Sequence, residues 1–383
     1  MTLSNWCESK LLRFFIHKAN VHCVVCGLAV FAVYWGIPFL FSIFDDTLLT
    51  EHGEKVVREL VPPLAGAGAF PKPLTSHPPG LKLAYLEDKT HLLFALFLVP
   101  AAMIFPVILR GINRCSNRLL EDHVIPESLL AQQTYDRFKA LANHQLGRVF
   151  SLSVAVTAFF LFFGFHLNPR FSYWWGSSQY GLAGLGLAII EFLMVYFGTQ
   201  AIIYIALGAI VIGHLVRINP KFHPFHHDGC SGFSPVGHLI MMLWLFAICL
   251  AAEIYVATKF GYLDLELNTM TWILAVTGLV ALPLIAIYPL YHCAQALYSL
   301  KLRELKELEP SLIGFYADAK HSATEHQYAN AAKSADNANS FVELHKYILE
   351  VSIWPFDTRA FSVVVAIYTV QCYLTMHELI AGR

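Results

Sequence analysis

Histidines at spacings typical of metal ligands are the residues of this chain best suited to chemistry. The stretch KFHPFHHDGCSGFSP, residues 221–235, contains the spelling H-x-x-H-H, and two further pairs have the spelling H-x-x-x-x-H. Imidazole binds iron and zinc well, and spacings of three to five place side chains on neighbouring faces of a helix. One hypothesis is therefore an iron centre formed by His17, His22, His223, His226, His227, His321 and His326.

On these histidines the sequence resembles the membrane fatty-acid desaturases and hydroxylases. The resemblance implies a di-iron oxidoreductase that acts on lipid, with iron as its cofactor. Two features differ from the family pattern. The late pair, His321 and His326, lacks a doubled histidine, and His22 is far from His223 along the chain.

The same stretch also has the composition of a tight turn that starts a membrane helix. Asp228 and Gly229 form a turn dipeptide, and Gly232 permits a second positive φ. Ser234 with the proline after it can start the next helix. Backbone N–H groups in such a turn can bind an anion, and the histidines beside them could bind it too or respond to pH. The residues of this candidate ligand or gating loop are His223, His226, His227, Asp228, Gly229, Cys230 and Gly232.

The composition of the whole chain indicates a membrane protein. Of its 383 residues 56% are hydrophobic and only 14% are charged, with a mean hydropathy of +0.54. A soluble domain has about 25% charged residues. The formal net charge is −1, and the sequence has no signature of duplex nucleic-acid recognition. The expected surroundings are therefore a lipid bilayer.

Apolar runs long enough to cross that bilayer predict the fold. About 20 residues span a hydrocarbon core of about 30 Å. We predict an all-α fold, a polytopic transmembrane helical bundle of about six to seven membrane helices. The run at 181–213 is one long helix or two segments broken near Gly198, and the short last run crosses the membrane or lies at its surface. The runs are 22–44, 91–109, 149–166, 181–213, 236–257, 271–292 and 361–377.

The distribution of positive charge predicts the orientation. With the N-terminus inside, 18 of the 26 Lys and Arg residues lie on the inner side, as the positive-inside rule favours. We therefore expect a multi-pass protein of the cell inner membrane with a cytoplasmic N-terminus. The predicted parts are a cytoplasmic N-terminus at 1–21, a transmembrane core at 22–298 with an outer loop at 45–90 and inner loops at 110–148 and 214–235, a cytoplasmic helical region at 299–360, and a C-terminal membrane segment at 361–383.

Two polar segments on the predicted inner side have helical patterns. Pro126 breaks the segment at 110–148, and the stretch SADNANS at 334–340 interrupts the segment at 299–360. Each segment then forms a cytoplasmic helical hairpin. Such hairpins can contact other subunits, so we expect a homo-oligomer.

Two acidic side chains lie within the predicted membrane helices. Glu191 and Glu253 must each contact protein, water or a partner, because an ionised carboxylate is costly in lipid. With the neighbouring Gln200, they are our candidates for an ion pathway. The alternative is that both glutamates have a structural role, either protonated or hydrogen-bonded.

A second resemblance rests on the loop itself. HHDGCSGFSPVG, residues 226–237, is similar to the H-P-D-G-C-G-G loop of a group of poorly characterised bacterial multi-pass membrane proteins, although His227 and Ser231 differ from that pattern. WPFDTR at 354–359 is similar too. Some proteins of this build act as membrane effectors in anti-phage defence, such as the Hailong channel. The resemblance implies a pore-forming effector.

These observations favour an ion channel or pore, without a cofactor, that is gated from the cytoplasmic side. An anionic or nucleotide-type ligand would act at the candidate gating loop. Two alternatives remain open. One is the di-iron oxidoreductase, and the other is a membrane scaffold that conducts nothing.

Overall fold

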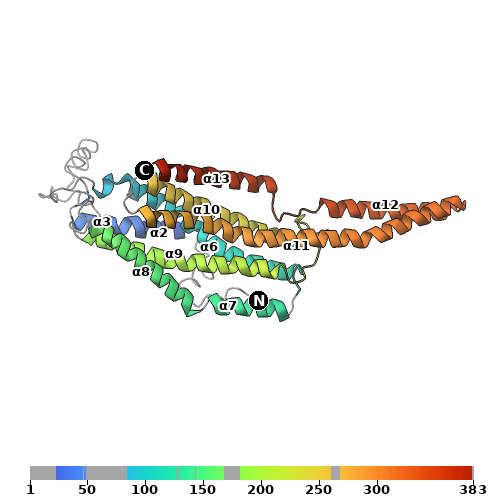
Figure 1. Cartoon of the computed structure of the whole chain (residues 1–383), viewed down its shortest axis with the longest axis horizontal. Coiled ribbons are helices and arrows are strands. Elements are labelled where there is room, and N and C mark those ends of the chain that lie inside the picture. Colours follow the sequence, from blue (N-terminus) through green and yellow to red (C-terminus); the bar gives the residue numbers. More distant parts are fainter. Residues whose placement is uncertain are drawn as a thin grey trace.

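The computed structural model describes residues 23–45, 47–48, 84–126, 129–142, 144–167, 182–259 and 268–381 (Figure 1). The described part is about 85% helical and contains no strand, so the predicted all-α polytopic bundle is confirmed. The N-terminal segment at 1–21 and most of the predicted outer loop at 45–90 lie outside the described residues.

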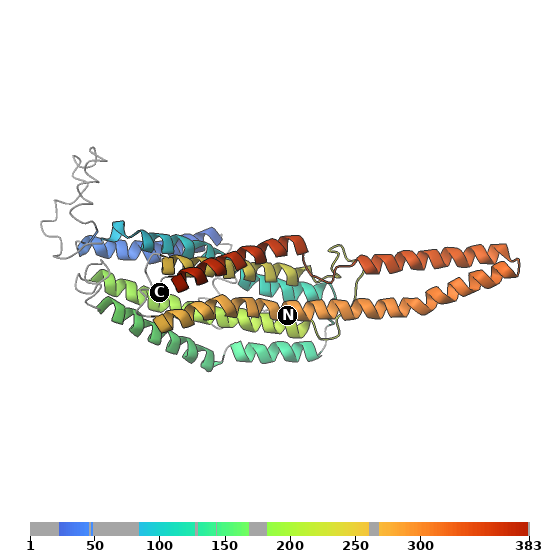
Figure 2. The ribbon, with the colours of Figure 1, turned by 45° about the horizontal axis from the view of Figure 1, so that its top comes forward.

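Long antiparallel helices form an elongated bundle, and six of those described are long and apolar enough to cross a membrane (Figure 2). The apolar part of a further helix, Gln145–Phe160, is shorter. The first span is Val24–Phe44, in which α2 (Cys23–Phe31) continues through a π-helical turn, η3 (Ala32–Gly36), into α3 (Ile37–Phe44). The other helices of the bundle are α6 (Lys89–Glu121), α8 (Gln145–Leu167), α9 (Leu182–Leu215), α10 (Ser234–Lys259), α11 (Asn268–Thr324) and α13 (Thr358–Ala381).

The run at 181–213 folds as one unbroken helix. α9 has 34 residues and continues through Gly198, where an added β-carbon would meet no other described part of the protein within 4 Å. The last run also forms one helix, and Thr358–His377 is long and apolar enough to cross a membrane. The interpretation of one helix therefore holds for α9, and α13 has the length of a full span.

Two helices continue well beyond their apolar runs. α6 reaches Glu121, although its predicted run ends at 109. α11 has 57 residues and contains Pro283, Pro289 and Pro310. Each proline removes one backbone hydrogen bond, but neighbouring helices support the chain on both sides of it. The apolar run of a sequence therefore gives the length of the membrane-spanning part, but it does not give the end of the helix. Both helices continue as polar helix after charged residues appear in the sequence.

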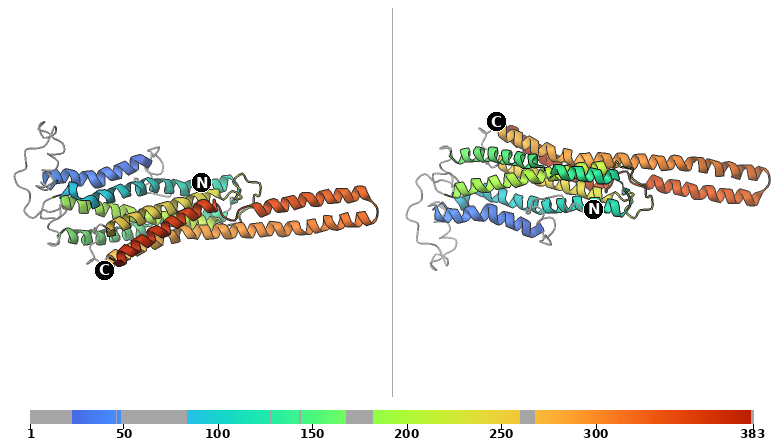
Figure 3. Two further views of the ribbon diagram at one scale, coloured as in Figure 1. Left: turned by 90° about the horizontal axis from the view of Figure 1, so that it is seen from above. Right: turned by 90° about the horizontal axis from the view of Figure 1, so that it is seen from below.

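The extension of α11 pairs with α12 (Tyr328–Glu350) in a hairpin that projects from one end of the bundle (Figures 1 and 3). We call this the hairpin end. The predicted interruption at 334–340 is wrong, because α12 runs through it. The turn lies at 325–327 instead, where His326 has a φ of 60°. Packing along α11 and the alanines of α12 outweigh the weak helix propensity of Asn, Asp and Ser.

α10 lies inside the bundle and contacts α6, α11 and α13. Its side chains Leu239, Ile240 and Leu243 are almost fully buried. Where α9 meets α6, a β-carbon at Gly208 would lie 2.6 Å from the Ile112 side chain, so only glycine allows these two helices to approach so closely. This core fixes the hairpin-end termini of α6, α9 and α10 beside one another. A short helix, α7 (Leu129–Ala142), also packs against α9.

Candidate functional site

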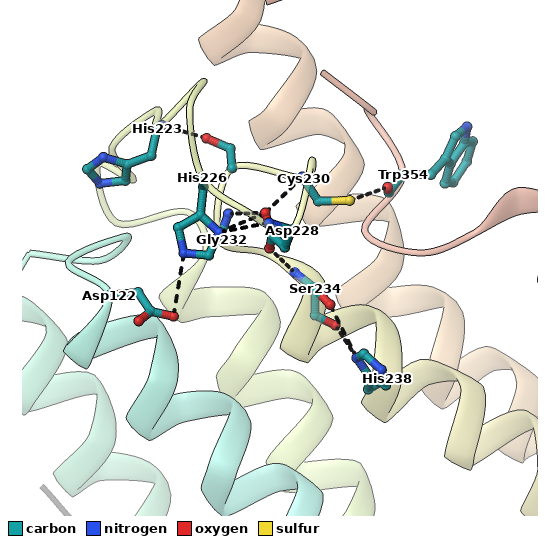
Figure 4. A network of polar contacts seen from close by, with 10 residues as sticks. Asp122, His223, His226, Asp228, Cys230, Gly232, Ser234, His238 and Trp354 are labelled. Atoms are coloured by element: carbon teal, nitrogen blue, oxygen red, sulfur yellow. Dashed lines mark hydrogen bonds and ion pairs between the residues drawn. The ribbon is translucent and has the colours of Figure 1, made fainter. Parts of the chain in front are cut away.

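The predicted gating loop lies at the hairpin end, between α9 and α10 (Figure 4). Its residues 216–233 contact two other connecting segments, 122–126 after α6 and 351–357 before α13. The N–H of Lys221 donates to the Val124 carbonyl at 2.8 Å, and the N–H of Ser352 donates to the Gly229 carbonyl at 3.1 Å. Three segments that are distant in sequence therefore meet at this loop.

The Asp228 carboxylate is the centre of the loop. Its Oδ1 accepts hydrogen bonds from the backbone N–H groups of Cys230 at 2.9 Å and Gly232 at 3.0 Å. Its Oδ2 accepts from the N–H of Ser234, the first residue of α10, at 3.1 Å. Burial alone would raise the pKa of Asp228, but these donors and His226 together lower it below its usual value. The charged carboxylate thus closes the loop and caps α10.

This arrangement changes what the glycine-rich turn can bind. The N–H groups of Cys230, Gly232 and Ser234 already have an acceptor within the chain. An external anion would have to displace Asp228 in order to use them. The loop therefore holds an internal anion, the Asp228 carboxylate, at these three donors.

His226 joins the loop to the end of α6. Its Nδ1 lies 2.8 Å from Asp228 Oδ1, and its Nε2 lies 3.9 Å from Asp122 Oδ2. At 2.8 Å the Nδ1–H donates to the carboxylate. The ring of His227 lies beside that of His226, with centroids 4.3 Å apart and the ring planes tilted by 35°. His226 therefore lies between two carboxylates, one within its own loop and one at the end of α6.

His223 contributes through its backbone. Its N–H donates to Ser231 Oγ at 2.6 Å, and its ring Nε2 lies 3.5 Å from the His123 carbonyl oxygen. Ser231 itself is 1% exposed and has a φ of 56°. Sequence reasoning did not select Ser231 or His123, because a left-handed serine and a histidine just past a helix carry no distinctive pattern.

Both glycines predicted to have positive φ do have it. Gly229 has a φ of 64°, and Gly232 has a φ of 88°. A β-carbon at Gly232 would also collide with the Val124 side chain, whereas a β-carbon at Gly229 would meet nothing within 4 Å among the described residues other than its chain neighbours. Gly232 therefore serves both the turn and the contact with the segment after α6.

Cys230 connects the loop to the segment before α13. Its thiol lies 3.4 Å from the Trp354 carbonyl oxygen and donates to it. Burial, followed by the Asp228 charge, raises the pKa of Cys230 to about 11, so the thiol stays protonated at neutral pH. Six cysteines among the described residues are free thiols.

A lysine of α11 forms hydrogen bonds at the base of the hairpin, where α12 ends and the segment before α13 begins. Lys301 Nζ donates to the carbonyl oxygens of Leu349 at 2.6 Å and Val351 at 3.0 Å. These acceptors lie at the C-terminal end of α12, where carbonyls lack partners within the helix. Lys301 thus holds α12 to α11 where the chain turns toward the loop, and nothing in its sequence surroundings indicated this role.

The histidines of the iron hypothesis are not brought together in the described residues. His321 and His326 lie at the tip of the hairpin, where they contact Glu325 and Tyr328. At about 1.5 Å per residue, α12 separates the tip from the loop by roughly 34 Å. His17 and His22 lie outside the described residues. Among the described residues, no three His, Cys, Asp or Glu side chains are grouped so that they could hold a metal ion.

The ion-pathway candidates lie on two helices. Glu253 of α10 is 7% exposed, and its Oε1 has no hydrogen-bond partner among the described residues. Gln200 of α9 is buried as well, and Glu191 is half-buried. Glu191 and Gln200 are nine positions apart, which places them on opposite faces of the continuous α9. The two side chains therefore project to opposite sides of α9.

Fold and composition define the class as a multi-pass α-helical membrane protein. A comparison with known proteins found no family model, curated protein or solved structure that matches this chain.

Proposed function

We propose that this protein is a membrane channel whose opening is controlled at its hairpin end. The observation that carries the proposal is Glu253, a carboxylate buried in a membrane-spanning helix with one oxygen left without a partner among the described residues. Such a group is costly to bury, and ionisable residues within a membrane commonly mark an ion or proton path. A cation or water that reaches Glu253 would supply the absent partner.

The contacts at the hairpin end support control from that side. The gating loop directly precedes α10, which carries Glu253, and it is bonded to the segment that precedes α13. Lys301 links the hairpin to the same segment. A ligand or a protonation change that moves the hairpin or the loop would therefore act on α10 and α13 together.

Three further parts of the proposal rest on the sequence. Positive charge favours a cytoplasmic hairpin end in a cell inner membrane, the exposed hairpin favours a homo-oligomer, and the loop motif favours an anti-phage effector that responds to a cytoplasmic anionic or nucleotide-type ligand. Protease treatment tests the orientation. The hairpin should be cleaved in inverted membrane vesicles and protected in intact spheroplasts.

Ion flux into liposomes that contain the full-length protein tests the channel. Glu253→Gln keeps the shape of the side chain and removes its ability to ionise, so we expect a clear change in flux or selectivity. Glu343→Gln on the exposed face of α12 is the matched control and should behave as wild type. A bilayer that stays impermeable across pH values and nucleotide ligands, with correctly folded protein present, would reject the channel.

The hairpin also favours a second candidate, a membrane scaffold that conducts nothing. Tyr316 and Tyr328 are 69% and 68% exposed on it, as partner-binding aromatic residues often are. A scaffold would give no flux in the same liposomes. Nothing among the described residues favours the di-iron alternative.

A further inference from the structure

Three arginines form an unpaired basic stripe on α6. Arg110, Arg114 and Arg118 follow one another at intervals of four residues, so they lie on one side of the helix. Arg114 and Arg118 are exposed, and Arg110 is half-buried. Within the described residues, none of the three forms an ion pair with a carboxylate.

The opposite side of α6 accounts for the direction in which the stripe points. Ile108, Ile112, Cys115 and Leu119 are all at most 6% exposed and belong to the bundle core. Because these side chains lie on the other face, the arginines point away from the core. The stripe is therefore a surface feature of the bundle.

The depth of the stripe matches the boundary of a membrane. The apolar span in α6 begins at His91, and about 20 residues cross a hydrocarbon core of about 30 Å. Arg110 then lies where the hydrocarbon ends, and Arg118 lies roughly 12 Å further along the axis. Lipid headgroups occupy this zone, and Glu121, about one turn beyond Arg118, is the first acidic residue of α6 past the stripe.

We propose that this stripe binds the phosphate groups of an anionic phospholipid at the hairpin end of the bundle. A guanidinium donates two parallel hydrogen bonds to a phosphate, and it loses less hydration than an ammonium when it does so. Three arginines over about 12 Å can hold two phosphates, from one lipid with two phosphates or from two adjacent lipids. This proposal is independent of whether the protein conducts ions.

Lipid retention by the full-length protein tests the site. The protein is exchanged into neutral detergent with phosphatidylglycerol or phosphatidylcholine, and retained lipid is counted by native mass spectrometry. We expect wild type to retain phosphatidylglycerol and not phosphatidylcholine. The double variant Arg114→Gln/Arg118→Gln should bind phosphatidylglycerol about tenfold or more weakly, since each basic residue near a membrane surface contributes to attraction of anionic lipid.

A matched variant separates a defined site from general charge. Lys320→Gln/Lys333→Gln removes two exposed positive charges from the hairpin and should retain lipid as wild type does. Arg114→Lys/Arg118→Lys should be intermediate, because lysine keeps the charge and loses the paired donors. Equal loss in the hairpin variant, equal retention of both lipids, or displacement of the lipid by millimolar inorganic phosphate would overturn the proposal. Thermal melting confirms that each variant is folded.

Discussion

Gly237 of α10 lies directly against the backbone of Pro355, so closely that a β-carbon at Gly237 would collide with the Pro355 carbonyl oxygen. The contact joins the start of α10 to the segment that leads into α13. A movement of either element at the hairpin end must therefore displace the other. The proposed control of α10 from the hairpin end requires such a contact.

Replacement of Gly237 tests how tightly this joint is packed. Because the obstacle is backbone, Gly237→Ala should destabilise the protein by about 1–3 kcal/mol, as overpacking does. The midpoint of thermal unfolding in detergent measures the effect. Gly198→Ala is the control, since its β-carbon would meet no other described part of the protein within 4 Å, and it should leave the protein unchanged or slightly more stable. Equal midpoints for the two variants would contradict the close contact.

The two loop glycines should differ in their sensitivity to substitution. Gly229→Ala meets open space and should cost only the left-handed backbone strain, about 1–2 kcal/mol. Gly232→Ala adds a collision with Val124 and should cost more. Unfolding midpoints of both variants rank the two costs. A reversed order would show that the loop is arranged differently around Val124.

Removal of the Asp228 charge should loosen the loop. Asp228→Asn weakens bonds from three backbone N–H groups and from His226, and hydrogen bonds to a charged group contribute about 1.5–3 kcal/mol. Hydrogen–deuterium exchange should increase at residues 228–234. Asp336→Asn, at an exposed position of α12, should leave exchange in the loop as it is in wild type.

The same carboxylate predicts a dependence on pH. The folded-state pKa of Asp228 is lower than its unfolded value of about 3.9, so its contribution to stability is complete above about pH 4. The contribution is lost as the pH falls through the lower folded-state pKa. The difference in unfolding midpoint between wild type and Asp228→Asn should therefore be constant from pH 7 to about 5 and shrink toward pH 3. If the difference in unfolding midpoint became larger at acid pH, the folded-state pKa of Asp228 could not be lower than its unfolded value.

The lysine at the base of the hairpin should control the end of α12. Lys301→Met keeps the length of the side chain and removes its two hydrogen bonds to the Leu349 and Val351 carbonyls. We expect faster hydrogen–deuterium exchange in the last turn of α12 and in residues 351–357. Lys306→Met, an exposed position further along α11, is the control. Unchanged exchange in the Lys301 variant would show that the hairpin base does not depend on this contact.

The length and spacing of the apolar runs were sufficient to predict the fold class. The break at 334–340 was predicted wrongly because local propensity favours a turn there, whereas packing of α12 along α11 decides in favour of a helix. The positive φ of Gly229 and Gly232 was predictable, because glycine in a turn has a local reason for that conformation. The left-handed Ser231 had no such local signal.

The sequence by itself determined that this is an α-helical membrane protein, because scarcity of charge and long apolar runs are local properties to which a bilayer responds directly. Only the tertiary structure decided what the HHDGCSGFSP loop contacts. Cys230 and Trp354 are 124 positions apart, and His226 meets Asp122 at the end of another helix. Such contacts depend on how the helices pack. The same holds for the hydrogen bonds that Asp228 accepts from the N–H groups of its own loop. The H-x-x-H-H stretch, whose spacing suggested metal ligands, therefore belongs to a loop that connects the ends of α6 and α10 to the segment before α13.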